Sequence, residues 1–205
     1  MTPHTARPSG AGCAGTVSSV VDRGGRVRSL VLGGARSGKS AHAEGLVPED
    51  APVTYVATAR RDPSDAEWNE RIAAHVARRP AAWRTVEAPD PASPRRVLAE
   101  AGDGDHVLVD DLATWLTGVL DDAGAWERDR AALAVVAEHC DALVTAVSEG
   151  SGHVVLVSAE VGLGVVPETR SGRLFRDELG SLNARLAAVC DEVLLLVAGC
   201  PLRIR

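Results

Sequence analysis

A glycine-rich loop with a single lysine offers the clearest chemistry in this sequence. Residues Gly33, Gly34, Ala35, Arg36, Ser37, Gly38, Lys39 and Ser40 follow a short apolar run and open a helical pattern. In a loop of this kind, backbone N–H groups surround phosphate oxygens, and the helix that follows adds the positive end of its dipole. Lys39 would reach the β- and γ-phosphates, and the Ser40 hydroxyl would bind Mg²⁺. The spacing therefore predicts that a nucleoside triphosphate binds at residues 33–40, and Lys39 is the only lysine among the 22 basic residues.

An acid at the end of another apolar run is the expected second partner for Mg²⁺. Asp110 follows Val107–Val109, and such a strand-terminal acid holds the metal in P-loop proteins. The next residue, Asp111, is expected to cap the helix that begins at Leu112. Without the glycine-rich loop, Asp110 would be only a strand terminus. With it, we predict Ser40 and Asp110 as the metal ligands.

His75 could be a nucleophile, although its position alone does not indicate this. It lies three residues after Ile72 and seven after Trp68, at the border of an apolar helical stripe. A lone histidine at such a place is more often structural than catalytic. The other five histidines have no better case: His4, His42, His106, His139 and His153. From the residues alone, the sequence predicts an Mg-nucleotide-dependent transferase or hydrolase.

Short strand-like runs that alternate with helical patterns must position these side chains. We expect strands at Ser29–Leu32, Val53–Thr58, Arg84–Val86, His106–Asp110, His153–Ser158, Glu192–Val197 and Leu202–Ile204. Between them, apolar residues recur at steps of three and four, as in Leu133–Val147 and Phe175–Val189. A capping-box spacing starts a further helix at Ser64, and Pro80 ends it. This alternation predicts an α/β fold with a mostly parallel sheet covered by helices on both faces.

Length and composition limit the class of protein. The chain of 205 residues suits one domain, which we place at residues 28–205 after an aperiodic leader at 1–27, whose deletion should change little. The net charge of -6 argues against nucleic acid as a partner. No apolar run reaches about 18 residues and no secretory signal is evident, so we expect a cytoplasmic protein without membrane insertion. The four scattered cysteines are expected to be reduced.

From Leu30 onward, the sequence resembles the bifunctional adenosylcobinamide kinase/adenosylcobinamide-phosphate guanylyltransferase family of cobalamin biosynthesis. The segments that carry the resemblance are Leu32–Ser40, Tyr55–Ala59, Arg71–His75, Arg79-Pro80, Trp83–Glu87, Leu108–Asp110, Glu160–Glu168, Phe175–Asp177 and Leu182–Leu186. Several ordered blocks are more specific than a P-loop alone.

The resemblance implies a RecA-like P-loop fold and two reactions. The first phosphorylates the aminopropanol hydroxyl of adenosylcobinamide with ATP or GTP. The second transfers GMP from GTP to that phosphate through a guanylyl-histidine, a role that falls on His75. Imidazole can attack near neutral pH, which suits this covalent step. A homo-oligomer, a trimer in similar proteins, is also implied.

The resemblance further implies the residues that contact the nucleotide. Besides the P-loop and Asp110, these are Thr58, Ala59, Arg60, Val76, Ala77, Arg78, Arg79 and Glu87, with Glu87 able to accept from guanine N1–H and N2–H₂. One departure from the pattern is Ala159, where similar proteins carry Asn. Glu160 and Asn183 could equally contact a ligand or serve loop structure and helix packing.

Two rival functions are open. An ordinary small-molecule P-loop kinase with a structural His75 would transfer the γ-phosphate but never retain GMP. A non-enzymatic, nucleotide-gated interaction module would bind GTP without acting on corrinoids.

Overall fold

A seven-stranded sheet forms the centre of the protein, in the order β3-β2-β4-β5-β1-β6-β7. The computed structural model describes residues 25–48, 51–60, 64–88 and 90–205; the side chains of Trp68, Arg71, Ala74, His75 and Arg78 lie outside the description. All neighbouring strands are parallel except β6 and β7, which are antiparallel. The strands are β1 (Arg28–Gly33), β2 (Val53–Ala57), β3 (Arg84–Glu87), β4 (His106–Asp110), β5 (His153–Ala159), β6 (Glu192–Val197) and β7 (Cys200–Arg203).

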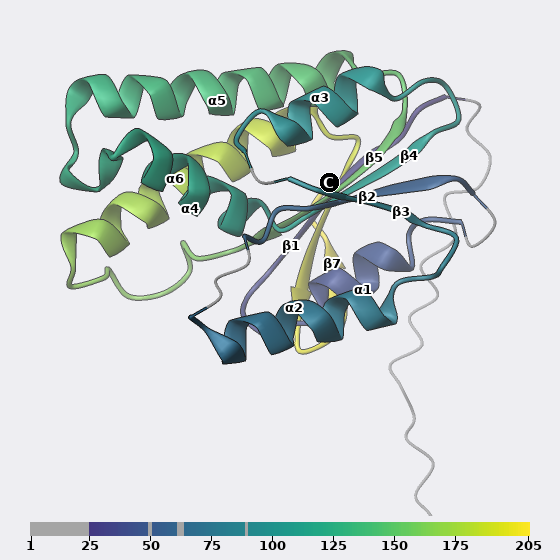
Figure 1. Cartoon of the computed structure of the whole chain (residues 1–205), viewed down its shortest axis with the longest axis horizontal. Helices are drawn as coiled ribbons and strands as arrows, with labels where there is room; N and C mark the ends of the chain where they lie inside the picture. The colour runs from purple at the N-terminus through teal and green to yellow at the C-terminus, as the bar shows by residue number, and fades with distance from the viewer. Residues whose placement is uncertain (1–24, 49–50, 61–63, 89) are drawn as a thin grey trace, which may run out of the picture.

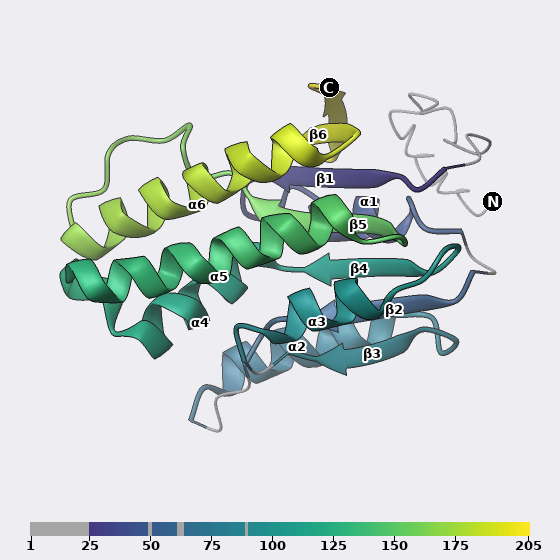
Figure 2. The ribbon, with the colours of Figure 1, turned by 90° about the horizontal axis from the view of Figure 1, so that it is seen from above.

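Helices cover both faces of the sheet (Figure 1). Helices α3, α4, α5 and α6 lie on one side, while α1 and α2 lie on the other. Seen from above, β3, β2, β4, β5 and β1 lie side by side (Figure 2). The helices are α1 (Lys39–Glu44), α2 (Ala66–Arg78), α3 (Ser93–Glu100), α4 (Leu112–Ala123), α5 (Arg130–Glu149) and α6 (Arg170–Val189), with a 3-10 turn at Ala125–Glu127.

Alternating side chains of the inner strands divide the core into two parts. In β1, Leu30 and Leu32 join the cluster beneath α3 to α6, whereas Val31 joins the cluster on the α1 side. The central strands have nearly continuous apolar runs because both of their faces are buried. In β4, Val107 and Val109 likewise face one cluster and Leu108 the other. The predicted α/β fold with a mostly parallel sheet is therefore confirmed.

Most predicted elements occur within a residue or two of their expected bounds. Among the strands, the last one is shifted most: β7 covers Cys200–Arg203 rather than Leu202–Ile204. It starts earlier because Gly199, with φ of 81°, turns the chain directly after β6. Helix α2 begins at Ala66 and ends at Arg78, before Pro80. Within the described part of the chain, Cys140, Cys190 and Cys200 form no disulfide, as expected of reduced cysteines; the first two are buried and Cys200 is exposed. Cys13 lies outside the described residues.

Arg26 and Val27, at the end of the expected leader, form hydrogen bonds with the folded body. Arg26 donates hydrogen bonds to the carbonyls of Ser148, Glu149 and Gly150, at the end of α5. Val27 donates its N–H to His153 Nδ1 at 3.2 Å, and its carbonyl accepts from Val154 at 2.9 Å. An arginine at a helix C-terminus satisfies carbonyls that lack intrahelical partners. Arg26 and Val27 therefore belong to the folded body, and residues 1–24 lie outside the described part of the chain.

Among the described residues, one helix has the length and apolar composition that a membrane span needs, contrary to the expectation from the sequence. This helix is α5, Arg130–Glu149. Its buried residues Val136, Cys140, Leu143 and Val147 join the core cluster beneath α3, α4 and α6. Long core helices pass the same test of length and composition, so α5 is weak evidence for a membrane.

Two stacked histidines stand at the amino ends of β4 and β5. The rings of His106 and His153 have centroids 4.6 Å apart and are nearly parallel, at 10°. Burial, followed by the charge of His153, holds the pKa of His106 below its ordinary value of 6.5. The unfolded chain therefore binds this proton more readily than the folded protein does. The contribution of His106 to stability is complete above pH 6.5 and is lost as the pH falls below it.

The variant His106→Gln should lose less thermal stability on acidification than the unmodified protein. We expect a shallower fall in melting temperature between about pH 7 and about pH 5. His42, whose pKa burial lowers, and Asp111, whose pKa burial raises to about 6, titrate in this window in both proteins. Asp90, Asp122 and Asp191 have lowered pKa values and act below this window. Equal slopes in scanning calorimetry would show that His106 is not the group responsible.

Candidate active site

The glycine-rich loop connects β1 to α1 at the carboxyl edge of the sheet. A Cβ on Gly33 would collide with the Ser37 hydroxyl and lie 3.0 Å from the Leu196 carbonyl, so only glycine fits there. Gly38, directly before α1, has φ of 89°, a conformation that favours glycine. The Ser37 carbonyl accepts from Gly199 N–H at 3.0 Å, which fixes the loop to the β6–β7 turn. The local sequence thus builds a tight loop whose backbone can approach a phosphate closely.

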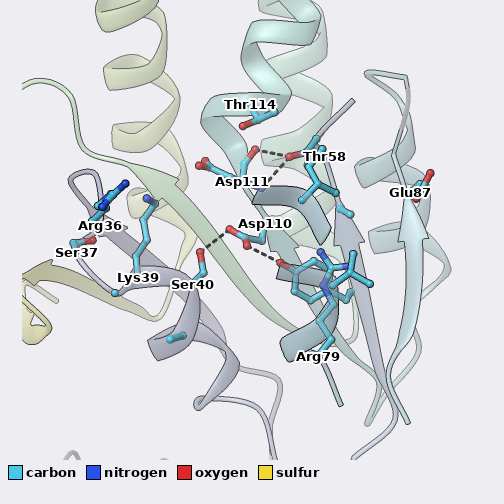
Figure 3. A pocket seen from close by; sticks show the side chains of 17 residues that line it. Arg36, Ser37, Lys39, Ser40, Thr58, Arg79, Glu87, Asp110, Asp111 and Thr114 are labelled. Atoms are coloured by element: carbon cyan, nitrogen blue, oxygen red, sulfur yellow. Dashed lines mark hydrogen bonds between the residues drawn. The ribbon is translucent and has the colours of Figure 1, made fainter. Parts of the chain in front are cut away.

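A pocket of about 500 Å³ opens at this edge, a size typical of small-ligand sites. Ligands of parallel α/β sheets generally bind at the carboxyl ends of the strands. Arg36, Ser37 and Lys39 lie on one side of the pocket, and Glu87 at the end of β3 lies on the other (Figure 3). The lining residues are Arg36–Ala41, Tyr55, Ala57–Ala59, Ile72, Val76, Arg79, Glu87, Asp110, Asp111 and Thr114.

Asp110 and Ser40 face each other across the floor of this pocket. The Ser40 hydroxyl donates to Asp110 Oδ1 at 3.3 Å, and the Tyr55 hydroxyl donates to Oδ2 at 2.6 Å (Figure 3). Among the described residues, no group of three or more His, Cys, Asp or Glu could hold a metal. A hydroxyl and one carboxylate nevertheless fit Mg²⁺, which is usually bound by one or two carboxylates together with phosphate oxygens and water.

Asp111 also lines the pocket, but its carboxylate and backbone make hydrogen bonds that hold the local chain. Its carboxylate accepts from Ala113 N–H at 2.8 Å, which confirms the predicted cap of α4. Thr58 donates to the Asp111 carbonyl at 2.7 Å and accepts from the Asp111 N–H at 2.9 Å. Burial, and to a smaller extent the charge of Asp110, raises the pKa of Asp111 to about 6, while its bond from Ala113 and the nearby Lys39 oppose this. The two neighbouring acids therefore have different tasks.

Helix α2 forms one wall of the pocket. Ile72, Val76 and Arg79 line it, and these positions share one helical face. Helical spacing places the backbone of His75 on this face, three residues after Ile72 and four before Arg79. The Arg79 guanidinium lies 3.7 Å from the centre of the Tyr55 ring. Arg79 and Tyr55 therefore link the end of α2, the helix that carries His75, to Asp110 on the pocket floor.

Comparison with known proteins identifies the family of this protein. A sequence model of the family described as cobinamide kinase / cobinamide phosphate guanyltransferase matches residues 29–204. The chain belongs to this family. The bifunctional adenosylcobalamin biosynthesis protein CobP of Pseudomonas aeruginosa is 42% identical over 182 residues, covering 87% of this chain and 98% of that protein. Its Escherichia coli relative, CobU, is 39% identical over 182 residues, covering 86% of this chain and 98% of that protein.

A solved structure supports the P-loop fold of this cobinamide kinase/guanyltransferase family member. It is a prototypical ATPase from a type III secretion system, with a TM-score of 0.52 and 11% identity. The match covers 83% of this chain but only 51% of the ATPase chain. At this identity the likeness concerns the fold alone, and the predicted P-loop architecture is confirmed.

The structure brings many of the predicted site residues of this family member to one pocket. Arg36, Ser37, Gly38, Lys39, Ser40, Thr58, Ala59, Val76, Arg79, Glu87 and Asp110 line it. Gly33, Gly34 and Ala35 form the loop behind it, and Ala77 lies exposed on α2. The side chains of His75 and Arg78 lie outside the described residues, so their roles stay predictions.

Arg60 points elsewhere in the described structure. Its guanidinium donates to both carboxylate oxygens of Asp122 on α4, at 2.7 and 2.6 Å, and lies against Gly118. Arg60 is not among the described residues that line the pocket. A paired, bidentate arginine is held in one place, so this ion pair fixes the start of the β2–α2 connection to α4.

The structure favours the structural alternative for Glu160 and Asn183. Glu160 accepts from Gly162 N–H at 2.6 Å, within its own loop. Asn183 is buried; it accepts from the Ser158 hydroxyl at 2.7 Å and donates to the Ala159 carbonyl at 3.0 Å. Sequence reasoning missed Tyr55, which touches both Asp110 and Arg79. A tyrosine within a largely apolar strand was the available signal, since a buried hydroxyl needs a partner.

Proposed function

We propose that the protein phosphorylates adenosylcobinamide with ATP or GTP and then transfers GMP from GTP to the phosphate, giving adenosylcobinamide-GDP. The observation that carries this proposal is the family match over residues 29–204, together with the P-loop pocket at the carboxyl edge of the sheet. The relatives from Pseudomonas aeruginosa and Escherichia coli are named as bifunctional adenosylcobalamin biosynthesis proteins.

In the proposed first reaction, the acceptor hydroxyl attacks the γ-phosphorus and the nucleoside diphosphate leaves. Lys39 and the backbone of the loop would hold the triphosphate, and a bound Mg²⁺ would neutralise charge on the β- and γ-phosphates. Ser40 and Asp110 are the residues that would hold this ion. Two buried groups without a partner among the described residues support an anionic ligand here, the Ser37 hydroxyl and Arg79 Nε.

In the proposed second reaction, the imidazole of His75 attacks the α-phosphorus of GTP and pyrophosphate leaves. The phosphate of the acceptor then attacks the same phosphorus, the phosphorus–nitrogen bond breaks, and the imidazole is regenerated. The position of His75 on the pocket-facing side of α2 supports this role. Glu87, across the pocket from the P-loop, is suitably placed to accept from guanine (Figure 3).

A cytoplasmic homo-oligomer, a trimer as the resemblance implies, completes the proposal. Exposed apolar residues support an interface between copies. Leu163 and Val165, in the β5–α6 loop, are 81% and 95% exposed, and Val197 and Leu202 on β6 and β7 are also exposed. Apolar surface of this kind is commonly covered in an assembly. Light scattering after size-exclusion chromatography should give a mass above that of one chain; a monomer would contradict this part of the proposal.

Product analysis tests the proposed reactions. With adenosylcobinamide and ATP, mass spectrometry should detect adenosylcobinamide phosphate, and addition of GTP should convert it to adenosylcobinamide-GDP. Phosphate without the GDP product would favour the ordinary kinase. Nucleotide binding with no corrinoid product would favour the interaction module.

The variant Asp110→Asn should require more Mg²⁺ because it loses the negative charge beside Ser40. We expect the Mg²⁺ concentration for half-maximal phosphorylation to rise by about tenfold or more. Asp111→Asn is the matched control, since asparagine caps a helix as well as aspartate does. Its Mg²⁺ midpoint should stay at the wild-type value. An unchanged midpoint in Asp110→Asn would move the metal role to another residue.

A further inference from the structure

Tyr55, on the pocket floor, contacts both Asp110, the proposed metal ligand, and Arg79 at the end of the wall formed by α2. Its hydroxyl donates to Asp110 Oδ2 at 2.6 Å, while Ser40 donates to the other oxygen at 3.3 Å. The residue is only 1% exposed and lies in the middle of β2. If the hydroxyl had no role, phenylalanine would fill the same space at this position, because the ring is the same.

Strand register explains how Tyr55 reaches the acid. In the parallel pair of β2 and β4, Tyr55 lies opposite Leu108 and Ala57 lies opposite Asp110. Along the parallel strands, Tyr55 therefore lies two residues before the level of Asp110, and its long side chain spans this distance. A short polar side chain at this position would not reach the Asp110 carboxylate. The length of tyrosine and its terminal hydroxyl both suit a contact with Oδ2.

Two described side chains contact the ring of Tyr55. Arg79, directly after α2, places its guanidinium 3.7 Å from the ring centre, a cation–π contact. Trp83 stacks on the ring at 6.3 Å between centroids and 28° between planes. A ring fixed in this way presents its hydroxyl in one direction, so the hydrogen bond to Asp110 is preorganised.

Building on the proposed function, we propose that Tyr55 is a positioning residue that orients the Asp110 carboxylate toward Mg²⁺ and the triphosphate. Ser40 would leave Asp110 Oδ1 to bind the metal, and the Tyr55 bond would then be the remaining described side-chain contact that fixes the carboxylate. A neutral hydroxyl that donates to a carboxylate forms a charge-assisted hydrogen bond and leaves the other oxygen available.

The variant Tyr55→Phe tests this role because it removes the hydroxyl and keeps the ring against Arg79 and Trp83. Calorimetric titration with GTP should show an Mg²⁺ midpoint about tenfold higher than in the wild type. The midpoint should not rise further when Tyr55→Phe is added to Asp110→Asn, since two residues that act through one contact are not additive. Thr117→Val, which deletes a hydroxyl bonded to the Ala113 carbonyl on α4, is the control and should leave the midpoint unchanged.

A second readout leaves the Tyr55 hydroxyl in place, because Tyr55 is the only tyrosine of the chain and can be labelled selectively. Incorporation of 3-fluorotyrosine labels this site alone, with fluorine next to the hydroxyl. Its fluorine resonance should shift when Mg²⁺ is added to the GTP complex, and the shift should be absent in Asp110→Asn. Loss of folding in Tyr55→Phe would therefore leave the proposal testable.

The outcomes separate this inference from the proposed function. Both measurements use Mg²⁺ and GTP without a corrinoid, so a protein that fails to act on adenosylcobinamide still tests Tyr55. An unchanged Mg²⁺ midpoint in Tyr55→Phe, additive effects in the double variant, or a fluorine resonance that ignores Mg²⁺ would each overturn the proposal.

Discussion

Replacing Lys39 by alanine should lower both phosphorylation of adenosylcobinamide and GMP transfer by about a hundredfold to a thousandfold. Both reactions need a held triphosphate, and Lys39 lies on the P-loop side of the pocket with Arg36 and Ser37 (Figure 3). Removing its ammonium deletes a charge-assisted contact to the β- and γ-phosphates. Initial rates with ATP and GTP, measured on protein with an unchanged melting temperature, check this expectation.

Arg84→Ala is a suitable control because it removes one positive charge from exposed strand β3. It should leave both rates close to those of the wild type. Lys39 also allows a direct binding test, since it is the only lysine. GTP should protect it from an amine-reactive reagent, as peptide mapping would show. Wild-type rates in Lys39→Ala, with an intact fold, would contradict the assignment of the P-loop.

Replacing His75 by asparagine should separate the two reactions. GMP transfer should be lost, because no imidazole remains to attack the α-phosphorus. Phosphorylation of adenosylcobinamide should persist, because that step needs Lys39, Ser40 and Asp110 but no protein nucleophile. Mass spectrometry of the corrinoid products, with ATP first and GTP added afterwards, would resolve the two steps.

His139→Asn, on α5 at the far side of the sheet from α2, is the matched control and should keep both activities. Loss of both reactions in His75→Asn would mean that α2 is needed for nucleotide binding as a whole. Retained GMP transfer would place the nucleophile at another residue.

The parts of the site that depend on local sequence were predictable. The P-loop is one continuous segment, and its strand and helix signals lie next to it, so the positions of Lys39 and Ser40 followed directly. The order of the strands in the sheet could not be predicted from the local sequence. Asp110 and Tyr55 meet because β2 and β4 are neighbours, although helix α2, β3 and α3 separate them in the chain.

Two further contacts were not predicted from the sequence, because both are long-range. Arg60 was expected at the nucleotide but forms an ion pair with Asp122, whose helix lies beside the β2–α2 connection. Arg26 lies in an aperiodic, glycine-rich segment, yet it caps a helix end more than a hundred residues away in the chain. Periodicity reports which face of an element is buried, not which distant carbonyl or carboxylate a side chain meets.

Labelling with GTP tests the central claim most directly, because only a guanylyl-enzyme retains the α-phosphate. After incubation with Mg²⁺ and denaturation, GTP radiolabelled at the α-phosphate should leave label on the wild-type chain, and GTP labelled at the γ-phosphate should not. The bond should be labile to acid and comparatively stable to alkali, as a phosphorus–nitrogen linkage is, and peptide mapping should locate it at His75. Absence of α-label on folded wild-type protein, or equal label on His75→Asn, would contradict the account.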